Sequence, residues 1–144
     1  MSFLPLSPLL AAVAAVSLCT APAAFAAERE TAKAGSRAAA GAERLAALLE
    51  GREAGEPVRC IATLPTDQIT TIDHTAYVFG RGATIYVQHT SDPASIRSDR
   101  ALAVQRYQQS ELCRLDPART FDPIIGFFTG NVFFENFIPY SRMK

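Results

Sequence analysis

Two short apolar runs around residue 80 form the clearest pattern of hydrophobic and polar positions in the chain. Residues 75–79 (TAYVF) and 83–88 (ATIYVQ) are rich in β-branched and aromatic side chains, and Gly80-Arg81-Gly82 separates them. This pattern is typical of a β-hairpin closed by a short glycine loop. Both faces of the hairpin keep apolar residues, so we expect it to be covered on both sides or curled into a small barrel-like sheet.

The register of this hairpin depends on the length of its loop. Gly82 suits the left-handed position that ends a three-residue loop, and we therefore prefer that loop. It pairs Phe79 with Ala83 and Tyr77 with Ile85, which mixes aliphatic and aromatic side chains on each face. A two-residue loop would instead sort the aliphatic side chains from the aromatic ones.

A helix is predicted over residues 42–54 (AERLAALLEGREA), where Gly55 and then Pro57 supply stop signals. Its apolar positions follow the i, i+3, i+4, i+7 spacing of a narrow stripe, made of Leu45, Leu48, Leu49 and Arg52. We expect this stripe to lie on the sheet, and a partner-binding helix is the alternative. The preceding residues 27–41 are Ala-rich and predict a flexible lead-in with some helical character.

Four further runs predict strands, because apolar residues alternate with polar ones or β-branched residues cluster. One of them, 101–107, has a helical alternative, since Ala, Leu, Gln and Arg also favour helix. The predicted strands are 58–64, 69–72, 101–107 and 132–138, and the predicted turns are Pro65-Thr66-Asp67, Asp73-His74 and Thr129-Gly130-Asn131. Together these elements predict a mainly β (α+β) fold: a small antiparallel sheet, or a curled barrel-like sheet, with one N-terminal helix packed on it.

Residues 121–140 (FDPIIGFFTGNVFFENFIPY) are the most apolar part of the chain after its N-terminal segment. Strand alternation places Phe134 and Phe137 on opposite faces. We interpret the segment as a core strand that lies against the helix or closes the sheet. The functional alternative is an aromatic patch that binds an apolar protein partner.

The first 26 residues contain no charged side chain and include an apolar run that ends near Ala24-Phe25-Ala26. The A-x-A pattern predicts a signal peptide over 1–26, cleaved after Ala26, and hence a periplasmic or secreted protein. A retained membrane anchor and a lipoprotein signal at Cys19 are the alternatives. The mature chain is then expected to hold the lead-in 27–41 and a single β-rich domain over 42–144, with no stable membrane span.

Two cysteines remain after the predicted cleavage, Cys60 and Cys113. In an oxidising compartment an even pair usually forms a disulfide. Such a bridge would close a loop of about 54 residues and add roughly 4 kcal/mol in the chain-entropy model. Two independent buried thiols are the alternative.

The charge balance limits the partners. The chain has 14 basic and 14 acidic residues, which gives a net charge of zero. Nucleic-acid binding needs clustered Lys and Arg, so we expect no nucleic-acid partner. The same balance argues against electrostatic attachment to an anionic membrane.

Candidate chemistry is sparse. The only histidines, His74 and His89, fall near the open end of the predicted hairpin and, with Asp73, form a weak candidate metal site. A hydrolase would need a positioned serine and base, or an unpaired Cys113. The chain has no G-x-S-x-G, C-x-x-C, P-loop or H-E-x-x-H motif, so we expect neither a cofactor nor an enzyme.

A set of short elements resembles a family. The elements are Gly51-Arg52-x-Ala54-Gly55-x-Pro57-Val58-x-Cys60-Ile61, Ile72-Asp73, Thr75-Ala76, Ile85-Tyr86-Val87, Leu112-Cys113-x-x-Asp116 and Phe137-x-Pro139-Tyr140. Together they resemble small exported proteins of sphingomonad-type proteobacteria, a group with no assigned activity. The resemblance implies export and a two-cysteine framework, and it transfers no function.

The sequence therefore predicts a non-catalytic exported domain with a periplasmic interaction or envelope-associated role. The alternative is a periplasmic carrier of a small molecule or a metal, which would use the interior or mouth of a curled sheet.

Overall fold

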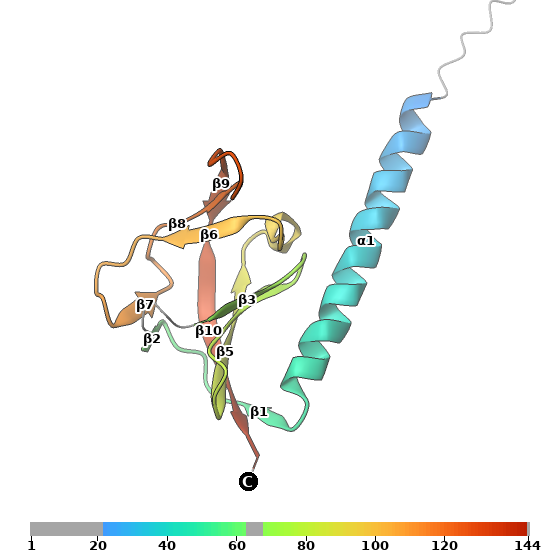
Figure 1. The fold of residues 1–144 in the computed structure, drawn as a ribbon. Coiled ribbons are helices and arrows are strands. Elements are labelled where there is room, and N and C mark those ends of the chain that lie inside the picture. The colour runs from blue at the N-terminus through green and yellow to red at the C-terminus, as the bar shows by residue number, and fades with distance from the viewer. Residues whose placement is uncertain (1–21, 63–67, 144) are drawn as a thin grey trace, which may run out of the picture.

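A computed structural model describes residues 22–62 and 68–143 as one long helix followed by three antiparallel sheets (Figure 1). A single 3-10 turn, η1 (Pro93–Ser95), interrupts the strands. The elements are α1 (Pro22–Leu49), β1 (Arg52–Ala54), β2 (Cys60–Ala62), β3 (Ile69–Ile72), β4 (Ala76–Phe79), β5 (Thr84–Thr90), β6 (Ala101–Val104), β7 (Glu111–Cys113), β8 (Ala118–Phe121), β9 (Phe128–Val132) and β10 (Phe134–Arg142). The fold is mainly β with one N-terminal helix, which confirms the predicted class.

The largest sheet has the strand order β1-β10-β5-β4-β3. It is open, with β1 and β3 at its edges. The strands β2 and β7 form a second sheet, and β6, β8 and β9 form a third. The described strands thus make three open sheets, and the prediction of an antiparallel sheet describes them better than that of one curled sheet.

The central hairpin, β4–β5, forms where the sequence predicts it, but the preferred register is wrong. Tyr77 pairs with Gln88 and Phe79 with Tyr86, instead of with Ile85 and Ala83. The connection between the paired residues is longer than three residues, and Gly80, with φ 85°, is the glycine that takes the left-handed conformation. The resulting faces are those predicted for the alternative register, with aliphatic side chains sorted from aromatic ones.

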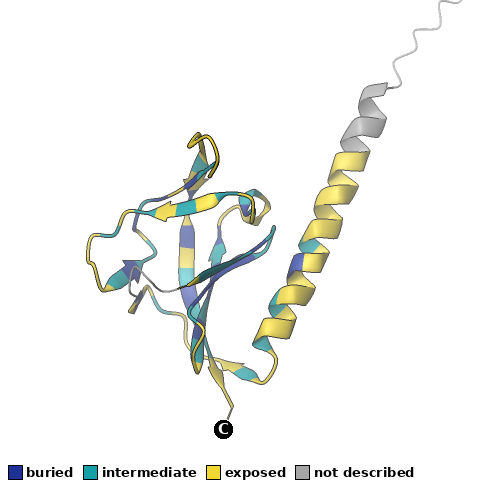
Figure 2. Ribbon diagram, in the orientation of Figure 1, coloured by how far each residue is buried: buried dark blue, intermediate teal, exposed yellow. Residues whose placement is uncertain are grey.

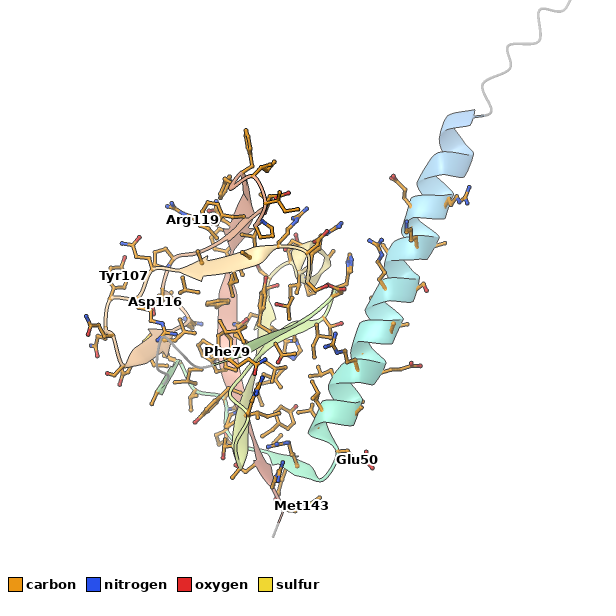
Figure 3. All side chains as sticks on the ribbon, in the orientation of Figure 1. Glu50, Phe79, Tyr107, Asp116, Arg119 and Met143 are labelled. Carbon is orange, nitrogen blue, oxygen red and sulfur yellow. A yellow bond between two sulfur atoms is a disulfide. The ribbon has the colours of Figure 1, made fainter. Side chains whose placement is uncertain are left out.

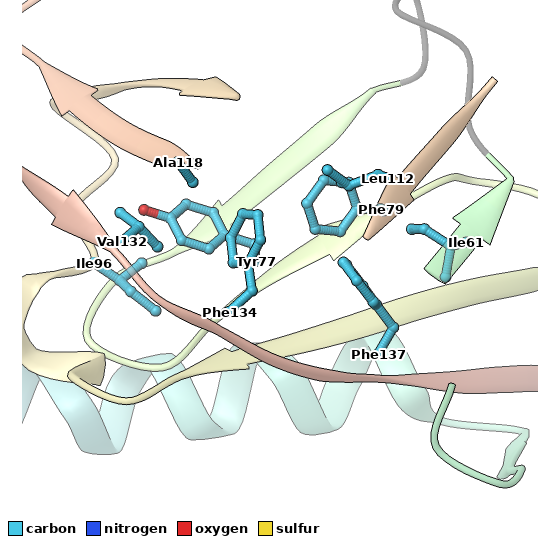
Figure 4. Close-up of a cluster of buried hydrophobic side chains, with 9 residues drawn as sticks. All are labelled: Ile61, Tyr77, Phe79, Ile96, Leu112, Ala118, Val132, Phe134 and Phe137. Atoms are coloured by element: carbon cyan, nitrogen blue, oxygen red, sulfur yellow. The ribbon is translucent and has the colours of Figure 1, made fainter. Parts of the chain in front are cut away.

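The aromatic face packs into the main core, where the three sheets meet (Figure 4). The rings of Phe79 and Phe137 meet edge to face at 5.7 Å, and those of Tyr77 and Phe134 at 6.3 Å. Such pairs each add about 0.5–1.5 kcal/mol beyond the burial of their area. The buried members of this core are Ile61, Tyr77, Phe79, Ile96, Leu112, Ala118, Val132, Phe134 and Phe137.

The aliphatic face packs under the C-terminal half of α1. Leu45 and Leu49 contact it from the helix, while Leu48 is exposed. Two of the three leucines in the predicted stripe therefore pack on the sheet. Gly41 lies so close to the carbonyl of Asp73 that a β-carbon would not fit there. The members of this second core are Ile72, Ala76, Val78, Ile85 and Val87.

The bounds of the helix differ from the prediction of 42–54. The helix runs from Pro22 to Leu49, because Gly51 takes a left-handed conformation with φ 71° and ends it before Gly55. The next residues form β1 and pair with β10. The lead-in 27–41 is helical too, and where its side chains are described they are almost all exposed (Figure 2).

Some predictions fall outside what the structure describes. Residues 1–21, most of the predicted signal peptide 1–26, lie outside the described residues, and cleavage after Ala26 stays a prediction. The predicted break at residues 65–67 also lies outside them. The first predicted strand, 58–64, is described as far as Ala62 and contains the short strand β2, in which Ile61 is buried.

The C-terminal segment departs most from the prediction. Thr129-Gly130-Asn131, expected to form a turn, lies within β9, and the chain reverses earlier, after Asp122. The last strand is β10 (Phe134–Arg142) rather than 132–138. The pairing of β10 with β5 is irregular between Phe134 and Phe137. This bulge turns both rings into the same core, so their placement on opposite faces is wrong.

Candidate interaction surface

The hairpin β8–β9 ends in a loop that projects at the top of Figure 1. Four large apolar side chains, three on this loop and one on the first residue of β9, face solvent, and we name them the apolar tip. Their exposed fractions are 91% for Ile124, 68% for Ile125, 71% for Phe127 and 53% for Phe128. Single exposed apolar residues are common on proteins, but four within five positions are a patch that needs explanation.

Asp122 organises the loop that carries the apolar tip. Its Oδ1 accepts hydrogen bonds from the backbone N–H groups of Ile124 at 2.8 Å and Ile125 at 3.2 Å. Its own N–H donates to the carbonyl of Phe127 at 2.8 Å, and its carbonyl accepts from Gly126 at 2.9 Å. These four bonds hold the loop in one shape, so the apolar side chains are presented by an ordered backbone.

Two local features complete the loop. Gly126 has φ 72°, a conformation that glycine adopts at little cost. At the base of the loop, the rings of Phe121 and Phe128 meet edge to face at 6.1 Å. The Asp-Pro step and the later glycine are ordinary turn chemistry, and this signal at 122–126 would have located the turn from sequence.

A cleft of about 440 Å³ lies at the other end of the same hairpin, lined in part by the exposed side chains of Leu115 and Phe133. Asp116, which is buried, shapes the cleft wall: its carboxylate accepts a hydrogen bond from the N–H of Cys113 at 2.8 Å. Arg119 is exposed on the cleft rim. Exposed apolar side chains therefore occur at both ends of the β8–β9 hairpin.

The structure places Asp73 and His74 in the predicted turn and His89 on β5. Among the described residues, the only group of three His, Cys, Asp or Glu ligand atoms close enough to share a metal ion contains Cys60, Glu111 and Cys113. The two histidines and Asp73 therefore do not converge.

The polar pocket beside His74, about 230 Å³ in volume, does not have the arrangement of a hydrolase. Ser98 Oγ donates directly to Asp73 Oδ2 at 3.1 Å, whereas a catalytic triad needs the imidazole between serine and acid. Arg97 donates to Asp99 at 2.8 Å, and this bond lowers the pKa of that carboxyl. Arg97 and Asp99 thus bind each other, and the carboxylate of Asp73 is bound by Ser98.

Cys60 and Cys113 face each other directly across β2 and β7, with their sulfur atoms 2.05 Å apart. That is the bonding distance of a disulfide, as the cysteine count predicts. A bonded Cys113 is no nucleophile, and a bonded pair is no thiolate ligand for a metal. The cysteines therefore have a structural position beside Ile61 and Leu112 of the main core.

Comparison with known proteins adds no assignment: no protein-family model, curated protein or solved structure matches the chain. The resemblance to small exported sphingomonad proteins therefore stays a prediction. Within residues 22–62 and 68–143, none of the helical sequence has the length and apolar character needed to cross a membrane. The apolar tip is the strongest functional feature of the described surface.

Proposed function

We propose that the chain is an exported, non-catalytic interaction domain that docks to an envelope protein through its apolar tip. The observation that carries this proposal is the exposure of Ile124, Ile125, Phe127 and Phe128 on a loop fixed by Asp122. A loop that is ordered before binding loses little conformational entropy on docking, which leaves more of the burial energy for affinity.

The size of the apolar tip is consistent with a binding site. For Ile and Phe residues, the four exposed fractions correspond to roughly 600 Å² of accessible area. The largest apolar patch on a typical monomer covers about 300–600 Å², so the apolar tip lies at the upper end of that range. A concave apolar cleft in a partner would bury most of that area. If two copies of the protein met tip to tip, the two convex surfaces would contact each other over only part of that area. The total buried area would then stay below the ~1,200 Å² typical of stable interfaces.

The composition of the segment that carries the apolar tip favours a protein partner over a lipid surface. Residues 120–141 contain no lysine or arginine, and the chain has no tryptophan. Membrane-surface segments normally combine apolar side chains with Lys or Arg and with Trp. The one charged side chain in the loop, Asp122, would be repelled by anionic lipid head groups.

Two features support the remaining parts of the proposal. The sulfur atoms of Cys60 and Cys113 lie at bonding distance, which suits an oxidising compartment such as the periplasm. Among the described residues, the histidines and Asp73 do not form a common metal site.

The test is site-specific photo-crosslinking in the native cell. A photoreactive phenylalanine analogue replaces Phe127 in one strain and Tyr107, an exposed residue away from the apolar tip, in another. We expect a discrete adduct from position 127 and none from position 107. The crosslinked protein is then purified, and its affinity is measured against the wild type and the variant Ile124→Ser/Phe127→Ser.

The variant should bind at least tenfold more weakly, while its thermal midpoint stays unchanged because both side chains are exposed. Three results would overturn the proposal: equal crosslinking at both positions, equal affinity of the tip variant, or binding to liposomes without any protein adduct. A wild-type dimer that the tip variant abolishes would identify a second copy as the occupant instead.

A further inference from the structure

A second site lies at the opposite end of the molecule from the apolar tip. A cavity of about 600 Å³ opens between the C-terminal end of α1 and the β4–β5 hairpin, near the chain end. Glu50 and Met143 line it and lie at the lower end of the molecule in Figure 3, while Arg119 lies near the upper end. The volume falls within the 300–1,000 Å³ typical of small-molecule sites. The apolar lining is Leu48, Val78, Ile85 and Met143.

The cavity exists because the helix ends before the sheet does. Leu45 and Leu49 cover the aliphatic face from α1, and the helix stops after Leu49. Beyond that point Val78 and Ile85, themselves only 3% and 4% exposed, lie at the floor of the cavity, and the more exposed apolar side chains of Leu48 and Met143 also line it. An apolar chain lying in the cavity would continue the cover that the helix provides.

Three arginines surround this apolar floor. The guanidinium of Arg52 is already bound, because it donates to the carbonyls of Ala83 at 2.9 Å and Gly82 at 3.2 Å. Arg81 and Arg142 are different: among the described residues, neither guanidinium has a hydrogen-bond or ion-pair partner. Within the described part of the chain, the cavity mouth therefore holds two cations that could pair with a ligand.

The register of β1 and β10 is an independent sign that this end of the molecule suits an anion. Arg52 lies directly opposite Arg142 in this antiparallel pair. Directly opposed like charges destabilise a sheet. Among the described lining residues, Glu50 is the one acidic side chain, and the end of α1 adds about half a negative charge, so three arginines outweigh the negative charge there. A bound anion would turn this repulsion into attraction.

We propose that this cavity binds a single-chain amphiphile with an anionic head group. The carboxylate or phosphate of the head group pairs with Arg81 and Arg142. Arginine suits both anions because its guanidinium can donate two parallel hydrogen bonds to them. The alkyl chain lies against Leu48 and Met143, above the floor that Val78 and Ile85 form. The site is independent of the partner at the apolar tip, and it gives the chain a second, carrier-like capacity.

The test is calorimetric titration of the purified protein with four defined probes. Dodecanoate carries a carboxylate head group and dodecyl phosphate carries a phosphate, and binding of either one supports the proposal. Dodecanol lacks the charge, and inorganic phosphate lacks the chain, so we expect both to bind at least tenfold more weakly. Dodecyltrimethylammonium reverses the charge and should not bind.

Variants assign the binding to this cavity. Arg81→Gln/Arg142→Gln should weaken dodecanoate binding at least tenfold, whereas Arg119→Gln at the other end should leave it unchanged. Met143→Ser should weaken dodecanoate binding several-fold, because the alkyl chain loses an apolar contact. Both arginines are exposed, so the double variant should fold, with a thermal midpoint equal to or above that of the wild type.

The proposal is overturned if neither anionic amphiphile binds, if dodecanol or inorganic phosphate binds as tightly as dodecanoate, or if the double arginine variant keeps wild-type affinity. Failure here leaves the crosslinking at Phe127 untouched, because the two experiments use different surfaces.

Discussion

At the scale of single residues, Asp122 decides whether the apolar tip is ordered. Replacing it with Ala removes the acceptor for the N–H groups of Ile124 and Ile125 and leaves every apolar side chain in place. We expect partner affinity to fall several-fold, because the loop must then be ordered on binding, while stability falls by only about 1 kcal/mol. Isothermal titration against the crosslinked partner measures the first effect, and urea unfolding the second.

The matched control is Asp122→Asn, whose side-chain oxygen still accepts hydrogen bonds. It should recover most of the affinity lost in Asp122→Ala. An alanine variant that binds like the wild type would show that the order of the loop plays no part in docking.

Tyr77 makes stability depend on pH in the alkaline range. Burial raises the pKa of its hydroxyl to about 12, against a smaller opposing effect of Arg100. The unfolded chain loses this proton near pH 10 and the folded one near pH 12, so stability is complete below pH 10 and falls between the two values. The loss is at most about 3 kcal/mol, at 1.36 kcal/mol per pKa unit.

Urea unfolding at pH 9, 10, 11 and 12 measures this loss, and tyrosinate absorbance reports the ionisation. Tyr77→Phe serves as the control, because it removes the ionisable group from the same buried position. Its stability should decline less steeply across this range. Equal slopes for the two proteins would contradict the assignment to Tyr77.

At the scale of elements, the contact of α1 with the sheet depends on Gly41. A methyl group there would overlap the carbonyl of Asp73 and the hydroxyl of Thr75, whereas Gly35 has nothing within 4 Å. Gly35→Ala should stabilise the protein by up to about 1 kcal/mol through helix propensity. Gly41→Ala should destabilise it by about 1–3 kcal/mol, because the helix must move away from the sheet.

Chemical unfolding of the two alanine variants compares the same substitution at two positions of one helix. Opposite signs would show that α1 docks as described. If both variants were stabilised equally, the helix would not contact the turn at Asp73 in solution.

The two-stranded sheet β2–β7 depends on its cysteines. Its strands have only three residues each, too few to be stable as an isolated pair. Cys60 and Cys113 are 53 residues apart in sequence, so the double variant Cys60→Ser/Cys113→Ser should lose roughly 4 kcal/mol in the chain-entropy model. Intact mass with and without reductant checks the bridge, and two alkylatable thiols in unreduced, denatured protein would refute it.

The limits of sequence reasoning are clearest in these elements. The β4–β5 hairpin could be placed from its own residues, but not its register, because the choice depends on which core each face meets. Helix periodicity found Leu45 and Leu49, yet the helix end was set by Gly51 and by the pairing of β1 with the distant β10. Strand alternation gave the wrong faces for Phe134 and Phe137, because the bulge between them adds a residue that a two-residue repeat in the sequence does not reveal.

The candidate site was harder to predict for a related reason. An apolar run such as 121–128 reads as core, because burial is the usual fate of Ile and Phe. The Asp-Pro step and Gly126 could have located the turn, but the exposure of its apolar side chains is visible only in the structure. The arginines of the cavity are far apart in sequence, and only the strand register brings Arg52 beside Arg142.

At the scale of the whole molecule, the two proposed sites lie at opposite ends and share no loop (Figures 1 and 3). The strand β10 runs between them through the main core, but a close-packed core transmits a change only if it has two alternative packings. We therefore expect the two binding events to be independent. The affinity of the partner captured at Phe127 should change less than twofold when dodecanoate saturates the cavity.

The reverse titration checks the same point, because linkage requires each ligand to change the affinity of the other by the same factor. Ile124→Ser/Phe127→Ser should leave dodecanoate affinity unchanged, and Arg81→Gln/Arg142→Gln should leave partner affinity unchanged. A change above fivefold in both directions would contradict independence. It would mean that the core around Phe79 and Phe137 adopts a second packing, and that the cavity controls docking at the apolar tip.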